Sequence, residues 1–252
     1  MAANFWTSSH YRTLHDEEKV GHVLPADGQR GLTEEDIKVI KISMSQYIKS
    51  LAQQAKVRHR VVATAITYFR RVYTRKSFSE FDPCLVAPTC LYLASKAEES
   101  TVPAKHLIYY MKKTYQDDKG SFEVKDVLEM EMKLLEALDY YLVVYHPYRP
   151  LVRFLQDAGL NELIQDAWSL VNDTYKTDLV LMYPPHMIAL SCIFLSSVLK
   201  EKDTISWFED LRIDLNMLKN ICMVMLDFYD NYQHVELLDD RVHVALNKIR
   251  QR

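Results

Sequence analysis

The second half of this 252-residue chain repeats the first, and this internal repeat constrains the fold more than any other feature. Identical residues recur 102 positions apart, in the helices predicted near 57–76 and 83–99 and in their counterparts in the second half. One offset shared by two helices is hard to obtain by chance. A solenoid needs at least three copies, so two compact bundles packed side by side are the simpler architecture. The matching pairs are Ala65 with Ala167, Tyr73 with Tyr175, Pro83 with Pro185, Ala87 with Ala189, Cys90 with Cys192, Leu93 with Leu195, and Ser95 with Ser197.

Apolar residues at spacings of three and four predict helices along almost the whole chain from residue 33. Thr33, followed by three acidic residues, is typical of a helix N-cap. The chain has only 5 glycines, which disfavours all-β folds with many tight turns and dinucleotide-binding folds with glycine-rich phosphate loops. We therefore expect an all-α protein, with helices near residues 33–51, 57–76, 83–99, 103–115, 123–139, 149–159, 161–177, 184–200, 204–210, 214–232 and 236–250.

Two prolines, Pro147 and Pro150, follow the fifth of these helices and mark the best linker candidate. For the fifth helix the offset falls to about 90, and the polar loop at 116–121 accounts for part of the missing length. We expect an N-terminal helix and linker at 1–32, a first five-helix unit at 33–145, and a second unit with a C-terminal helix at 146–252.

Charge and composition disfavour several classes of protein. The net charge of −3 argues against direct nucleic-acid binding as a main role. A basic run on the second helix, from Lys56 to Lys76, is interpreted as a solvated helix face, with an acidic partner surface as the alternative. The four cysteines form no CxxC pair and the histidines form no HExxH pair, so we expect a reducing compartment and neither a metal nor a cofactor. No signal peptide or membrane span is predicted.

The repeat also isolates two unusual charges. Lys96 and Glu131 each continue an apolar helix stripe, and their counterparts in the second unit are Val198 and Ile221. Burying an unpaired charge is costly, so these side chains are expected at the rim of an apolar patch, where a partner can reach them. The alternative is that they pair with each other or extend to solvent at helix edges.

Several strings resemble the cyclin family. LYLASKAEE at 91–99 looks like the third-helix signature of the cyclin box, and Met130-Glu131 followed by Leu134, Leu135 and Leu138 resembles its fifth helix. NFWTSSHY at 4–11, VYHPYRPL at 144–151 and VNDTYKTDLVLMYPPHMIAL at 171–190 are similar to C-type cyclins. The resemblance covers nearly the whole chain and implies the cyclin fold, which consists of two five-helix repeats.

This resemblance implies a regulatory subunit that binds and activates a cyclin-dependent kinase and is not itself an enzyme. Lys96 and Glu131 would hold the kinase αC helix and the backbone leading into it, with apolar contacts around them from Leu93, Ala97, Leu135 and Tyr140. The N-terminal aromatic residues Phe5, Trp6 and Tyr11 are further kinase-contact candidates, or else a staple onto the first bundle.

A second candidate site lies in the other repeat. Trp168 and Asn172 are four positions apart and share a helix face; together with Asp173 and Tyr229 they could line a groove for a peptide or scaffold. The alternative places Trp168 in the core and makes Asn172 and Asp173 part of a hydrogen-bond network between the repeats.

The C-type resemblance further implies a role in RNA polymerase II transcription. The implied partners are the Mediator-associated kinase and its scaffold subunits, and the implied location is the nucleus. Two other functions fit the sequence less well. A cyclin-fold transcription factor of the general factor IIB type would need a zinc ribbon and a basic second repeat, which this sequence lacks. An enzyme is disfavoured because no phosphate loop, GxSxG motif or metal constellation is present.

Overall fold

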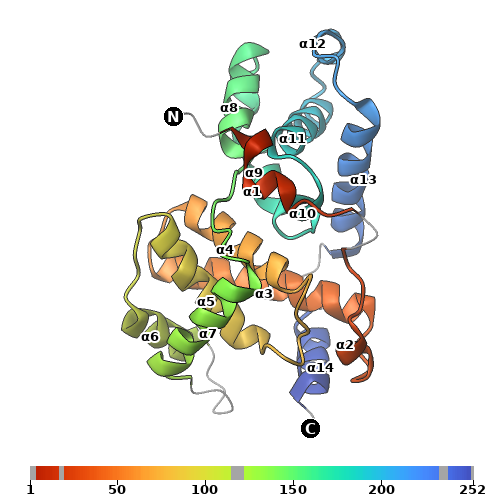
Figure 1. Ribbon diagram of the computed structural model, residues 1–252. Helices are drawn as coiled ribbons and strands as arrows, with labels where there is room; N and C mark the ends of the chain where they lie inside the picture. Colours follow the sequence, from red (N-terminus) through yellow and green to blue (C-terminus); the bar gives the residue numbers. More distant parts are fainter. Residues whose placement is uncertain (1–3, 17–19, 115–121, 233–237, 251–252) are drawn as a thin grey trace.

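The computed structural model describes residues 4–16, 20–114, 122–232 and 238–250, and within these ranges it contains helices and no strand (Figure 1). The predicted all-α class is confirmed. The first unit consists of α3 (Glu34–Gln54), α4 (His59–Val72), α5 (Pro83–Ala97), α6 (Ala104–Thr114) and α7 (Val124–Ala137). The second consists of α8 (Tyr148–Asp157), η4 (Asn161–Leu163), α9 (Ile164–Thr174), α10 (Leu179–Met182), α11 (Pro185–Leu199), α12 (Ile205–Asp210) and α13 (Leu215–Tyr232). The flanking helices are η1 (Phe5–Thr7), α1 (Ser9–Arg12), α2 (Pro25–Gly28) and α14 (Leu238–Arg250). The predicted polar loop at 116–121 lies outside the described residues.

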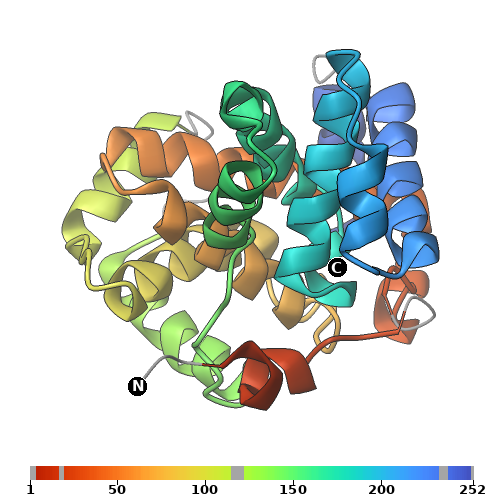
Figure 2. The same cartoon turned by 90° about the horizontal axis from the view of Figure 1, so that it is seen from above.

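Helices α5 and α11 are the centres of the two repeats. Each is 15 residues long and begins at one of the matched prolines, Pro83 or Pro185. α5 packs against α3, α4, α6 and α7, while α11 packs against α8, α9 and α13. The two bundles lie side by side in both views (Figures 1 and 2). Each unit contains its five predicted helices, and the second also contains the short helices η4 and α10, so the prediction of two five-helix units with flanking helices is confirmed.

Helix α3 shows how local sequence fixes an element. The Thr33 hydroxyl accepts the backbone N–H of Asp36, and the Asp36 carboxylate accepts the backbone N–H of Thr33, so two otherwise unpaired donors are satisfied. Along the helix, Ile40, Met44 and Ile48 are fully buried on one face. This stripe is the apolar surface that α3 packs against α4 and α5.

The interpretation of the basic run as a solvated face is wrong for two of its members. Arg70 and Arg71 are only 1% and 7% exposed. The physical reason is that α4 contacts α3 and α5 within its own bundle and also α10 of the second bundle. The periodicity of apolar residues in one helix predicts contacts within its own bundle, but it does not predict contacts with the other bundle.

Residues 143–146 of the predicted linker are not helical, whereas Pro150 lies in the first turn of α8, so the helix resumes before the second proline. The non-helical part is held from both sides. The backbone N–H of Tyr145 donates to Nδ1 of His10, over 2.9 Å. The ring of the next residue, His146, bonds Thr64 Oγ1 of α4 at 2.8 Å and the Tyr175 hydroxyl of the second repeat at 2.7 Å. The linker therefore fastens the two repeats together.

The C-terminal helix α14 packs on α3 of the first bundle (Figure 1). Lys248 Nζ lies 2.8 Å from an Asp36 carboxylate oxygen, and Arg241 lies 3.0 Å from Glu35. Both acidic residues are in the first turn of α3. Although the sequence grouped this helix with residues 146–252, its packing partner belongs to the 33–145 unit.

All four cysteines are buried free thiols. The described residues hold no cluster of three or more side chains able to bind a metal ion. None of the described helices is long and apolar enough to cross a membrane.

Candidate functional site

Lys96 and Glu131 meet on the surface formed by α5 and α7. Lys96 occupies the last turn of α5, where the helix dipole favours a cation, and Glu131 lies in the middle of α7. The Lys96 ammonium is 2.8 and 2.9 Å from the two carboxylate oxygens of Glu131. Both residues thus form one bidentate ion pair, as one of the two sequence interpretations predicted.

The ion pair lies at the rim of the surface, with one member exposed to solvent and the other largely buried. The Lys96 side chain is 40% exposed and the Glu131 side chain only 10%. Lys96 Nζ also lies 4.4 Å from the centre of the Tyr92 ring. Partial burial opposes the charge on Lys96, but the hydrogen bonds and charge of Glu131 and Tyr92 outweigh that effect and raise the Lys96 pKa.

The predicted apolar neighbours of this pair occupy different levels of the surface. Ala97 is exposed and Leu135 is half-buried, while Tyr140 is 65% exposed. Leu93 is only 3% exposed and packs in the core, so it supports the surface from beneath. We call the surface around Lys96, Ala97, Glu131, Leu135 and Tyr140 the α5/α7 face.

Two exposed apolar side chains near the pair were missed from the sequence. Leu128 and Met132 on α7 are 42% and 62% exposed. The repeat singles out charges that replace apolar residues, but it cannot single out apolar residues that remain exposed. Their counterparts in the second unit, Leu218 and Cys222, are apolar as well. Comparing the two repeats therefore does not distinguish these positions.

The equivalent surface of the second repeat is an apolar groove between α11 and α13, with a volume of about 550 Å³. Val198, the counterpart of Lys96, is 58% exposed, and Ile221, the counterpart of Glu131, is fully buried. The fold therefore presents the same surface twice, and only the first copy carries the ion pair.

The N-terminal aromatic residues form one edge-to-face cluster. The ring centres of Phe5, Trp6 and Tyr11 lie 5.2 to 5.7 Å apart. Phe5 also contacts Tyr145 of the linker, and Trp6 contacts His186 of α11. The cluster thus spans the junction of the repeats and does not staple onto the first bundle alone. Trp6 and Tyr11 remain 53% and 43% exposed.

The proposed groove residues of the second repeat form two separate sets. The Tyr148 hydroxyl of α8 donates to Asn172 over 2.9 Å, and the Tyr148 ring lies 4.6 Å from the Trp168 ring. On another side of α9, the Tyr229 hydroxyl donates to Asp173 over 2.9 Å. These bonds join helices within the second repeat. The alternative network between the repeats is therefore not what the structure contains, and Trp168 is half-buried rather than in the core.

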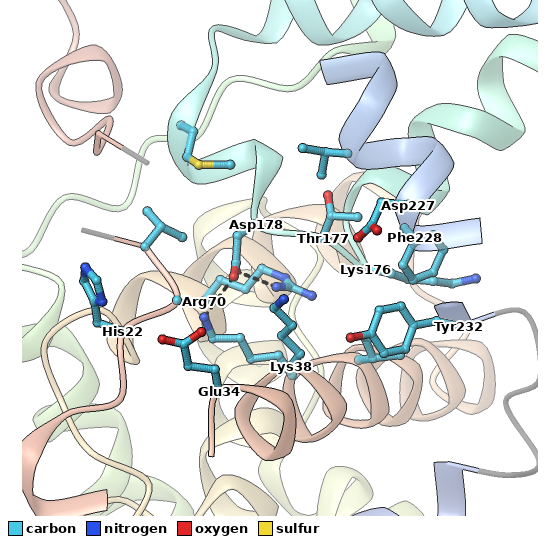
Figure 3. Close-up of a pocket in the computed structure, with 16 residues that line it drawn as sticks. His22, Glu34, Lys38, Arg70, Lys176, Thr177, Asp178, Asp227, Phe228 and Tyr232 are labelled. Atoms are coloured by element: carbon cyan, nitrogen blue, oxygen red, sulfur yellow. Dashed lines mark hydrogen bonds and ion pairs between the residues drawn. The ribbon is translucent and has the colours of Figure 1, made fainter. Parts of the chain in front are cut away.

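A buried charge cluster between the repeats was not predicted. Asp178, just before α10, bonds Lys41 of α3 over 3.0 Å and Arg70 of α4 over 2.6 Å (Figure 3). Burial alone would raise the pKa of Asp178, but the two cations outweigh it and hold that pKa well below its usual range. The cluster joins residues more than 100 positions apart, which helix periodicity cannot connect.

Comparisons with known proteins point to one family. The family profile for the cyclin N-terminal domain matches residues 11–143. Cyclin-C1-1 of Oryza sativa subsp. japonica is 62% identical over 99% of this chain and 98% of its own length. Cyclin-C of Rattus norvegicus is 39% identical over 97% of this chain and 88% of its own length.

The chain belongs to the cyclin family and is a C-type cyclin. Its fold matches a chain of the CAK complex of Chaetomium thermophilum bound to ATP-gamma-S, with a TM-score of 0.74 and 18% identity over 97% of this chain and 88% of that one. As a C-type cyclin it is a kinase-regulatory protein, and the family consists of regulatory subunits rather than catalytic ones. This assignment favours the kinase-regulator prediction over the factor IIB alternative.

Proposed function

We propose that this cyclin binds a cyclin-dependent kinase of the Mediator-associated type through the α5/α7 face and activates it in RNA polymerase II transcription. The observation that carries the proposal is the Lys96–Glu131 ion pair at the rim of exposed apolar side chains. Its nuclear location, and its association with scaffold subunits of the Mediator kinase module, belong to the same proposal and rest on its similarity to C-type cyclins.

The ion pair can bind a helix start without breaking. An ammonium has three N–H donors and a carboxylate accepts several hydrogen bonds, whereas the pair itself uses two contacts. Glu131 can accept the unpaired N–H groups at the beginning of the kinase αC helix, and Lys96 can donate to the carbonyls before it. Ala97, Leu128 and Met132 supply apolar area around these bonds.

Such docking activates the kinase by shifting an equilibrium. When αC moves inward, its glutamate pairs with the β3 lysine that positions ATP. The cyclin performs no chemistry; it stabilises the active arrangement because it binds that arrangement more tightly. The aromatic residues Phe5, Trp6 and Tyr11 are proposed as a secondary contact, since two of them remain exposed beside the linker.

The double variant Lys96→Ala with Glu131→Ala tests the proposal. We expect it to lose kinase co-purification and activation while its circular dichroism stays helical. The matched control is Lys125→Ala with Glu129→Ala, which removes an exposed ion pair from the same helix α7 and should leave binding unchanged. Full kinase activation by the folded Lys96 and Glu131 variant would refute the assignment of this face.

A second experiment tests the transcriptional context. The tagged protein is purified from nuclear extract and the co-eluting proteins are identified by mass spectrometry. We expect a cyclin-dependent kinase together with Mediator subunits. Recovery of a kinase without Mediator subunits would keep the kinase-regulatory role and contradict the Mediator assignment.

A further inference from the structure

A pocket of about 400 Å³ lies between the two repeats, away from the α5/α7 face (Figure 3). One wall is α3 of the first repeat and the opposite wall is α13 with residues 176–178 of the second. The wall from the second repeat combines the apolar side chains of Val224 and Phe228 with charged and polar ones, and Ile42 of α3 and Met182 of α10 add further apolar surface. Charged groups from both repeats line the remainder.

The floor of this pocket carries an excess positive charge. Lys41 is 3% exposed and Arg70 is 1% exposed, and both share the single carboxylate of Asp178. One carboxylate neutralises one cation, so the buried triad keeps a net charge of one. Because the Lys41 ammonium donates only one hydrogen bond among the described residues, to Asp178, it has donors left for a ligand. A buried cation without a counter-charge is costly, and an anion would relieve that cost.

The mouth of the pocket adds a further cation. Lys38 lies one turn before Lys41 on α3, and it forms no ion pair or hydrogen bond with any residue that the structure describes. In Figure 3 its side chain points towards the Arg70–Asp178 pair. Lys176 also lines the pocket, although its ammonium is held 2.8 Å from Asp173.

Two carboxylates limit how much negative charge the pocket accepts. Glu34 and Asp227 line the same space. Because Lys176 is already paired with Asp173, the three cations Lys38, Lys41 and Arg70 face the three carboxylates Asp178, Glu34 and Asp227. The excess positive charge is therefore confined to the buried floor. A dianionic phosphate would be repelled by Glu34 and Asp227 once the single excess charge is neutralised.

We propose that this pocket binds a ligand that carries one carboxylate on an apolar or aromatic body. The carboxylate lies between Lys38 and the buried Lys41–Arg70 floor, where it accepts charge-assisted hydrogen bonds. The apolar body packs against Phe228 and Val224. A free carboxylic acid and an acidic peptide side chain next to an apolar residue share this chemistry. None of the lining residues belongs to the α5/α7 face.

The test is a titration of the isotope-labelled full chain, followed by NMR and calorimetry, with phenylacetate as the probe. Its neutral analogue phenylacetamide and its dianionic analogue phenyl phosphate are compared. We expect phenylacetate to bind more tightly than both, with shifts at the lining residues of α3, α13 and 176–178, and at Arg70 of α4 and Met182 of α10. Lys38→Gln should weaken phenylacetate by about fivefold, the usual scale for a partly exposed charge pair. Lys49→Gln, an exposed site on the same helix, should change nothing.

Removing a carboxylate gives the opposite sign. Asp227→Asn should tighten phenylacetate binding, which a purely structural role of this exposed residue would not produce. Equal affinities for the acid and the amide, no effect of Lys38→Gln, or shifts located at α5 and α7 would each overturn the proposal. An acetylated Phe-Glu dipeptide amide identifies the source: binding tighter than phenylacetate assigns the site to a partner's acidic segment, and weaker binding assigns it to a free acid.

Discussion

Replacing Asp178 by asparagine is the sharpest test of how the two repeats are joined. The Asp178 carboxylate is the counter-charge of two buried cations from the first repeat, with contacts of 3.0 Å to Lys41 and 2.6 Å to Arg70. The amide keeps the shape of the side chain and one acceptor oxygen, but it removes the charge. Both cations then remain in a site where they are at most 3% exposed.

The expected cost follows from this geometry. Removing one partner of a buried ion pair typically destabilises a protein by about 3–5 kcal/mol, because the remaining charge is left uncompensated. Since asparagine still accepts a hydrogen bond, and since the Asp178 side chain is 17% exposed to water, we expect the lower end, about 3 kcal/mol. For a chain of this length that corresponds to a fall in Tm of roughly 6–12 °C.

The same substitution should change the response to acid. The pKa of Asp178 is held below its usual range in the folded protein, so its stabilising effect is complete above the unfolded pKa near ~4 and is lost as pH falls further. Asparagine does not titrate. The difference in unfolding free energy between wild type and Asp178→Asn should therefore be constant from pH 7 to 5 and smaller by about 1 kcal/mol at pH 3.

Urea unfolding at pH 7, 5 and 3, followed by circular dichroism, measures both effects. The control is Asp166→Asn, which removes a partly exposed ion pair with Lys200 and should cost less than about 1 kcal/mol. If Asp178→Asn costs no more than this control at pH 7, or if its cost is the same at pH 3, the cluster does not join the repeats electrostatically.

Three further predictions concern stability. Thr33→Ala removes one half of the α3 capping box and should lower the unfolding free energy by about 1 kcal/mol, whereas an unchanged Tm would contradict the role of that cap. Leu93→Ala should cost about 2–5 kcal/mol in urea unfolding, because Leu93 is a core residue; a cost below 1 kcal/mol would place it on the surface. Burial, followed by nearby cationic groups, lowers the pKa of both His10 and His146 to about 3. The contribution of these neutral imidazoles to the free energy of unfolding is complete above pH ~6.5 and is lost in acid, by up to about 1.4 kcal/mol per pH unit for each residue. Equal unfolding free energies at pH 7.5 and 5.5 would contradict this prediction.

Local signals predicted most of the fold. α5 begins at the expected Pro83 and α11 begins at Pro185, one residue after its expected start, because proline at a first helical position fixes the start without removing an internal hydrogen bond. The N-cap at Thr33 was also predicted from the sequence, and the structure confirms it. The helix expected at 57–76 instead ends at Val72, where the chain turns so that the backbone N–H of Phe78 reaches the buried carboxylate of Asp27. Contacts between distant segments can override helix periodicity in this way.

The candidate site was predicted in part, for a related reason. The contrast between the repeats identified Lys96 and Glu131, and the structure joins them. The inter-repeat cluster of Lys41, Arg70 and Asp178 gave no such signal. Each of its members is an ordinary charged residue within its own helix or loop, and the cluster exists only because three segments pack together.

The contrast between the two copies of the same surface also bears on partner choice. In the second copy, Val198 lines a largely apolar groove and Ile221 is buried beneath the surface, so this copy has no carboxylate that a partner must satisfy. In the first copy, docking covers the Glu131 side chain, of which only 10% is exposed before docking. Its two oxygens already accept hydrogen bonds from Lys96, but a partner without N–H donors would exclude water from their remaining acceptor sites without replacing it. A helix start offers such donors. On the proposed function, the ion pair therefore rejects unsuitable partners as much as it attracts the kinase.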